Sequence, residues 1–187
     1  TSGDIFPMLP EKLSSDLTSL GEGQDRLAIV VELVVAEDGS VLSSTLFRAV
    51  VHNHAKLAYN SVSQWLTGSE PAPERVMAVP GLDAQLRLQS RVAQRLKARR
   101  HQQGALSLET IEPRAVFEGE VLTGLRVEQK NRAKELIEDF MIAANQATVS
   151  YLKGKGISPF HRILHSPERW QRIREFAARW NGHLPQE

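Results

Sequence analysis

The chain has 187 residues, of which 23 are Lys or Arg and 22 are Asp or Glu, so its net charge is only +1. This balance indicates no partner by itself and, with 41% hydrophobic residues, it argues against a disordered chain or a long charged tail. The absence of cysteine excludes a disulfide framework and a thiolate metal site, and the sequence shows neither a signal-peptide pattern nor an apolar run of about 18 residues. We therefore expect a soluble, cytoplasmic protein without a membrane segment, consisting of one domain or part of a larger one.

The first predicted element is a β-hairpin. The segment LAIVVELVV at residues 27–35 is apolar at both alternating sets of positions, with Glu32 as its only polar residue. This pattern predicts a strand that is covered on both faces. Residues 37–40, EDGS, have turn chemistry, and residues 41–51 then form the returning strand.

A short helix, a loop and a long basic helix are predicted next. The short helix covers residues 57–67, and the Pro-rich stretch at residues 70–80 is expected to be a loop. From Leu82 to Arg100 the composition is strongly helical, with Asp83 as the only acidic residue. The basic residues that make this helix the main positive patch are Arg87, Arg91, Arg95, Lys97, Arg99 and Arg100.

Short strands and a long apolar helix occupy the next part of the chain. The segments LSLETIE, RAVFEG and EVLTGLRVEQ, within residues 106–129, are punctuated by proline and glycine and predict strands. Residues 131–152 then have the helical period, and beyond the first two turns they are nearly apolar all round. We expect this helix to run through the core, with a buried stripe of Leu136, Phe140, Ala144, Ala147 and Tyr151.

The C-terminal part is predicted to contain a strand and a last helix. The segment FHRILH at residues 160–165 is the candidate strand. Ser166 followed by Pro167 is typical of an N-cap with proline at the first helical position. The expected buried face of the helix consists of Trp170, Ile173, Ala177 and Trp180.

Three carboxylates lie within five residues near the start of the long apolar helix: Glu135, Glu138 and Asp139. A carboxylate that enters an apolar interior needs hydrogen-bond donors or a cation, and Glu138 is the one we question first. The alternative is that all three are solvated near a helix N-terminus, where negative charge suits the helix dipole.

Other candidate residues have equally ordinary alternatives. Tyr59 near the start of the short helix is suited to stacking on a base, or to half-buried packing. Lys56 is suited to a phosphate or to a surface position. The basic helix is suited to RNA phosphates or to simple solvation. The histidine pairs at residues 52 and 54 and at residues 161 and 165 are not accompanied by Cys or by a glutamate in an HExxH-like pattern, so they are weak evidence for zinc and we predict no metal site there.

Three segments together resemble one enzyme family. They are FPMLPEKLSSDLTSL at residues 6–20, AKLAYN at residues 55–60 and NRAKELIEDFMIAAN at residues 131–145. They resemble the middle of the catalytic RNB domain of the ribonuclease II and ribonuclease R exoribonucleases. The resemblance spans almost the whole chain and implies an α+β fold, with a mostly antiparallel sheet packed around a long central helix.

The resemblance also implies which residues line an RNA path. Glu138 matches a glutamate that contacts the ribose end of the RNA, and a carboxylate is able to accept a hydrogen bond from a 2′-hydroxyl. Tyr59 matches a tyrosine that contacts the RNA near its 3′ end. We add Lys56, Asn131 and Arg132 from the matching motifs, and from the basic helix Arg91 and Arg95. Some members stack the last bases between two aromatics, but this chain has Leu108 at one of these positions, and the other would fall just before Thr1.

The function implied is hydrolysis of single-stranded RNA from its 3′ end, with Mg²⁺ held by clustered aspartates. That cluster is expected upstream of residues 1–187 and an SPIR-like motif downstream, so this chain is expected to be the central part of the domain, to contain no catalytic or metal residues and to be inactive alone. The implied partners are single-stranded RNA, the remainder of the RNB domain and OB-fold domains. The alternative is an inactive RNB-like protein that binds RNA or acts as a scaffold.

Overall fold

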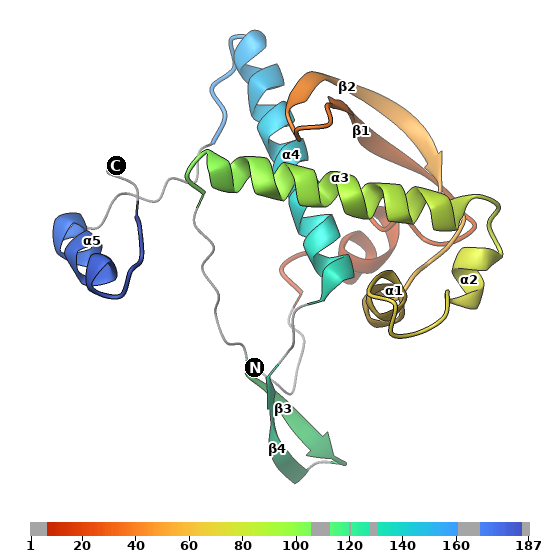
Figure 1. Ribbon diagram of the computed structural model, residues 1–187. Coiled ribbons are helices and arrows are strands. Elements are labelled where there is room, and N and C mark those ends of the chain that lie inside the picture. The colour runs from red at the N-terminus through yellow and green to blue at the C-terminus, as the bar shows by residue number, and fades with distance from the viewer. Residues whose placement is uncertain (1–6, 106–112, 120, 128–130, 161–168, 185–187) are drawn as a thin grey trace. The chain divides into compact units, whose positions relative to one another are not determined.

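The computed structural model describes residues 7–105, 113–119, 121–127, 131–160 and 169–184. It divides into two units, Thr1–Tyr151 and Leu152–Glu187. Helices and antiparallel hairpins confirm the predicted α+β class (Figure 1). In chain order the elements are η1 (Lys12–Leu17), β1 (Asp25–Val35), β2 (Val41–His52), α1 (Tyr59–Leu66), α2 (Glu74–Met77), α3 (Leu82–Gln102), β3 (Pro113–Glu118), β4 (Val121–Val127), α4 (Arg132–Gly154) and α5 (Trp170–Arg179).

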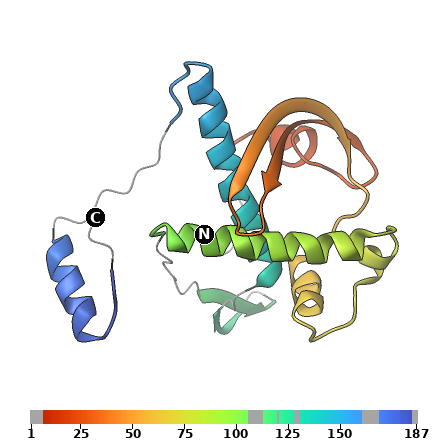
Figure 2. The ribbon, with the colours of Figure 1, turned by 45° about the horizontal axis from the view of Figure 1, so that its top comes forward.

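The predicted hairpin is confirmed as β1 and β2, which pair antiparallel with Leu27 opposite Val50 and Val31 opposite Leu46. The turn between the strands contains Gly39, which has φ +83° and packs against the backbone of α3. A Cβ on Gly39 would lie 2.6 Å from the carbonyl carbon of Arg95. The turn therefore needs glycine both for its left-handed backbone and for its approach to α3, which Figure 2 shows beneath the hairpin.

The prediction that residues 27–35 are covered on both faces is wrong for the described part of the chain. Leu27 is 86% exposed and Ile29 is 65% exposed, and Val50 on the paired strand is also open to solvent. Paired residues of an antiparallel ladder share a face, so these three side chains form one exposed apolar patch. An apolar run predicts that a strand tends to be buried. Burial itself requires another helix, strand or loop that packs on the strand.

A small core joins the helices. Val62 and Trp65 of α1 pack with Val76 and Ala133, and Leu82 and Leu86 of α3 lie against this cluster. Val76 belongs to α2, so the prediction that residues 70–80 form only a loop is wrong. A fully buried valine explains why this short helix forms within a Pro-rich stretch, because burying its side chain stabilises the fold by about 1.5–3 kcal/mol.

The long helix is confirmed as α4, and it crosses α3 in both ribbon views (Figures 1 and 2). Its buried face contains Leu136, Ala143 and Ala147, but Ile137 and Met141 are about half exposed. Tyr151 of the predicted stripe is 44% exposed. Within the described residues α4 is therefore an amphipathic helix with one buried face, and not a helix enclosed by the core.

The predicted strands RAVFEG and EVLTGLRVEQ are confirmed as the hairpin β3 and β4. The predicted strands at residues 106–112 and 160–165, and the Ser166 cap, lie wholly or almost wholly outside the described residues. The last helix is confirmed as α5, but its predicted buried face is wrong within the described part, since Trp180 is 76% exposed and Ile173 is 40% exposed. Among the described residues no helix has the length and apolar character needed to cross a membrane.

Candidate nucleic-acid interface

The three carboxylates of α4 have different surroundings. Glu135 accepts a hydrogen bond from Lys97 Nζ at 2.9 Å and one from Arg132 at 3.2 Å. Asp139 is only 2% exposed, and its Oδ1 lies 3.0 Å from the Arg100 guanidinium. Its Oδ2 has no hydrogen-bond partner among the described residues. Two of the three carboxylates are therefore paired with cations of the protein, and one of them, Asp139, is buried.

The cations around Glu135 favour its ionised form. Partial burial raises the pKa of Glu135, but the hydrogen bonds and charges of Lys97 and Arg132 lower it more, so the pKa lies below its ordinary value of 4.5. Glu135 therefore stays ionised to a lower pH than an unpaired glutamate. It makes an ion pair with α3 instead of offering a free acceptor to a ligand.

Glu138 is the third carboxylate, and unlike the other two it is exposed to solvent. Its side chain is exposed, and within the described part of the chain no hydrogen bond or ion pair is found for it. Glu138 lies about 100° around the helix axis from Asp139, which places it off the face that contacts α3. Both oxygens of Glu138 are thus available to accept hydrogen bonds from a bound molecule.

Tyr59 lies at the start of α1 and is 48% exposed. The neighbouring Asn60 accepts a hydrogen bond from the Asn131 amide at 2.9 Å, which ties the start of α1 to the start of α4. Glu138 lies seven residues along α4 from Asn131, a helical rise of about 10 Å. Lys56, three residues before Tyr59, is also exposed.

Asn131 and Arg132 have internal roles. The side-chain oxygen of Asn131 accepts backbone hydrogen bonds from Ala133 and Lys134, both at 3.1 Å, and so caps the start of α4. The Arg132 side chain is 13% exposed and binds Ser90 of α3 through two hydrogen bonds. The prediction that these two residues contact RNA stays untested, but their side chains are already used to fix α4.

The basic helix α3 has two kinds of cation. Lys97 and Arg100 bind carboxylates of α4, and Arg87 lies over the ring of the buried Trp65 at 4.6 Å. Arg91 and Arg95 are exposed, and no ion pair is found for them among the described residues. They lie four residues apart and therefore form one stripe on the helix surface. This stripe is the part of α3 that is open to an anionic partner.

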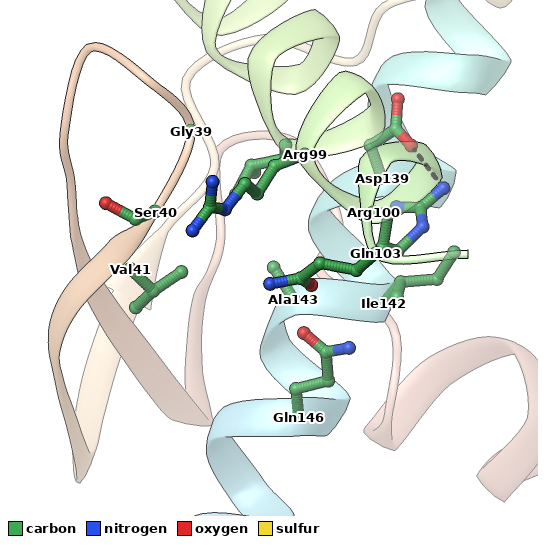
Figure 3. A pocket seen from close by; sticks show the side chains of 11 residues that line it. Gly39, Ser40, Val41, Arg99, Arg100, Gln103, Asp139, Ile142, Ala143 and Gln146 are labelled. Atoms are coloured by element: carbon green, nitrogen blue, oxygen red, sulfur yellow. Dashed lines mark hydrogen bonds and ion pairs between the residues drawn. The ribbon is translucent and has the colours of Figure 1, made fainter. Parts of the chain in front are cut away.

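A polar pocket of about 270 Å³ lies between the β1–β2 turn, the end of α3 and the middle of α4 (Figure 3). Its two arginines already face carboxylates, because Arg100 binds Asp139 and Arg99 lies 3.9 Å from Asp38. The remaining donors are the amides of Gln103 and Gln146. With its charges neutralised from within the protein, this pocket has no strong preference for an anion.

The described residues bring together no group of three or more His, Asp, Glu or Cys side chains that would hold a metal ion. Asp16 binds Arg26 at 2.9 Å, and Asp25 binds His52 at 2.7 Å. The carboxylates within the described ranges therefore do not fit a magnesium site of the aspartate-cluster type. His161, His165 and Leu108 lie outside the described residues.

Sequence reasoning missed the burial of Asp139 and questioned Glu138 instead. A usable signal was present, because Asp139 lies three residues after Leu136 and four before Ala143, both of which are buried. Its partner Arg100 belongs to the predicted helix at residues 82–100, which contains six basic residues and only one acidic residue. Unbalanced charge on one helix indicates partners elsewhere in the fold.

The comparisons with known proteins point to one family. The sequence model of the RNB domain matches residues 1–186. Ribonuclease R of Vibrio parahaemolyticus is 35% identical over 175 residues, covering 92% of this chain and 21% of that protein. Exoribonuclease 2 of Cronobacter sakazakii is 35% identical over 159 residues, covering 82% and 24%. The chain thus spans about a fifth of the length of these curated relatives.

Solved structures agree at the level of the fold. Mycoplasma genitalium RNase R, in complex with ribose-methylated single-stranded RNA, matches with a TM-score of 0.78 at 24% sequence identity. The match covers 97% of this chain and 28% of that one. The arrangement of helices and hairpins described above is therefore one that recurs within a larger nuclease.

Proposed function

This chain belongs to the RNB domain family, and on that premise we propose that it is the central part of a hydrolytic exoribonuclease that degrades single-stranded RNA from the 3′ end. The similarity to ribonuclease R and exoribonuclease 2 supports this function. The observation that carries the proposal for this part of the enzyme is the exposed Glu138, which is unpaired in the described part of the chain and lies beside two carboxylates that are both paired.

Glu138 is proposed to accept a hydrogen bond from a ribose 2′-hydroxyl. This group exists in RNA and not in DNA, so a carboxylate that binds it favours RNA. Tyr59 is proposed to stack on a base near the 3′ end, since a half-exposed ring offers an open face to any base. Lys56, Arg91 and Arg95 supply positive charge for phosphates.

Hydrolysis in the complete domain is proposed to use Mg²⁺, which would activate water and stabilise the leaving oxygen. The carboxylates described here do not fit that site, so its ligands are proposed to come from aspartates outside this chain. The exposed apolar side chains of β1 and β4, such as Leu27 and Leu125, support packing against the remainder of the RNB domain. We also propose that the complete polypeptide contains OB-fold domains and is located in the cytoplasm.

The first experiment measures magnesium-dependent shortening of a 5′-labelled single-stranded RNA. It compares this chain with a longer polypeptide that contains it, each with a chelator control. Stepwise shortening by the longer polypeptide alone is expected. Shortening by this chain would show that its own carboxylates hold the metal, and no shortening by either would favour the alternative of an inactive RNB-like protein that binds RNA or acts as a scaffold.

The second experiment tests the ribose contact in the active polypeptide. Glu138→Ala is expected to narrow the preference for RNA over a DNA oligonucleotide of the same sequence by about tenfold or more, because a hydrogen bond to a charged group contributes about 1.5–3 kcal/mol. Glu74→Ala, which removes an exposed glutamate of α2, is the matched control. An unchanged preference in the Glu138 variant would disprove the ribose contact.

A further inference from the structure

Residues of α3 bind Glu135 and Asp139 but not Glu138, and this explains why the three carboxylates differ in pairing. Lys97 and Arg100 are three residues apart on α3, and their partners Glu135 and Asp139 are four residues apart on α4. Both spacings place the two side chains on one face of their helix. The two ion pairs therefore lie on a single contact between the helices, at 2.9 and 3.0 Å.

Two ion pairs fix the orientation of α4 on α3 more firmly than one ion pair would. A single ion pair restricts the rotation of α4 about its axis only weakly beyond its apolar packing, whereas two pairs one turn apart on α4 restrict both rotation and sliding. Asp139 is 2% exposed, so water does not compete for this carboxylate. Arg132 adds a third attachment through Ser90. A change of one residue in the register of α4 would turn Glu138 by about 100°.

We infer that Lys97 and Arg100 are positioning residues, which do not touch the RNA but hold α4 in the orientation that presents Glu138 to a ribose. This inference rests on the proposed function of Glu138. It assigns a specificity role to the paired side of α3, whereas the exposed stripe of Arg91 and Arg95 is proposed only for phosphates. Figure 3 shows the Arg100 guanidinium directed at the Asp139 carboxylate, with both residues at the edge of the polar pocket.

Lys97 gives the better test, because its side chain is 35% exposed and its replacement leaves no deeply buried charge. In an active polypeptide that contains this chain, Lys97→Gln is expected to narrow the preference for RNA over DNA by at least about threefold. Lys97→Arg keeps a cation within reach of Glu135 and should restore the preference. Lys153→Gln, an exposed lysine near the end of α4, is the matched control, and unfolding temperature is recorded for every variant.

A double-mutant cycle with Glu138→Ala separates positioning from general stability. If Lys97 acts through Glu138, then Lys97→Gln should have no further effect on the preference once Glu138 is alanine. An equal loss in both backgrounds would overturn the inference, as would an unchanged preference in Lys97→Gln while Glu138→Ala narrows it. If Glu138→Ala itself leaves the preference unchanged, the ribose contact fails and the positioning role fails with it.

Discussion

Four cations of α3 fall into two groups that the sequence alone does not distinguish. Lys97 and Arg100 lie within 3.0 Å of carboxylates on α4, while Arg91 and Arg95 face solvent. The carboxylates of α4 divide in the same way, into a paired group and Glu138. A count of charged residues therefore does not say which of them are already neutralised by partners in the fold. Only the unpaired group is available to a ligand.

The largest expected effect comes from breaking the buried pair. Arg100→Met removes the cation from Asp139, which is 2% exposed, and we expect the free energy of unfolding to fall by about 3–5 kcal/mol because a buried charge loses its partner. Urea denaturation of the purified chain measures this decrease. Glu138→Ala, on the unpaired side, should change stability by less than about 0.5 kcal/mol.

A double variant tests whether the loss of stability comes from the unpaired Asp139 carboxylate. Replacing both partners, as Arg100→Met with Asp139→Leu, removes the unpaired charge and should recover most of the stability. If Arg100→Met alone is as stable as the unmodified chain, the ion pair does not hold α4 on α3. The division into paired and unpaired groups would then lose its physical basis.

The next effect concerns the packing of the β1–β2 turn on α3. Gly39→Ala places a Cβ against the Arg95 backbone at a residue with φ +83°, and we expect stability to fall by at least about 2 kcal/mol from overlap and backbone strain together. Gly68→Ala is the matched control, since Gly68 has φ +80° but open space around its Cα. The difference in unfolding temperature between the two variants measures the loss of stability that is due to overlap with α3. Equal decreases would mean that the turn does not pack on α3.

The elements of this fold could be predicted where the pattern is local. The apolar run and turn residues within residues 27–51 and the helical period in residues 131–152 each specify one local structure, and both predictions are confirmed. α2 could not be predicted in the same way, because its four residues form a helix around the buried Val76. The coverage of Leu27 and Trp180 was overestimated, since burial depends on a neighbouring surface that an apolar pattern does not supply.

The candidate site was predictable as a set of residues but not as a set of interactions. The position of Glu138 near the start of α4 followed from helical periodicity, yet the partners of Glu135 and Asp139 come from a helix about 40 residues earlier in the chain. No local pattern links residues at that separation. The unmatched charge of α3 was the signal that such partners exist.

A smaller effect is expected from the pH dependence of the Lys97–Glu135 pair. The folded chain lowers the pKa of Glu135 below 4.5, so the stability contributed by the ionised carboxylate is fully present above about pH 4.5 and is lost as the pH falls through the lowered pKa. Near pH 7 we expect Glu135→Gln to cost about 1 kcal/mol or less. The difference from the unmodified chain should shrink in denaturation curves below pH 4.5, and a constant difference would contradict the ion pair.

The smallest effect on stability is expected on the exposed stripe of α3. Replacing Arg91 and Arg95 together by alanine should change the free energy of unfolding by less than about 0.5 kcal/mol, because neither residue has an ion pair in the described part of the chain. If both arginines bind phosphates, the slope of log affinity for single-stranded RNA against log salt should flatten by about 1.4, because each phosphate that is no longer neutralised reduces the slope by about 0.7. Arg172 and Arg174 of α5, replaced in the same way, control for net charge. An unchanged slope would remove the stripe from the RNA path and leave α3 with its internal ion pairs alone.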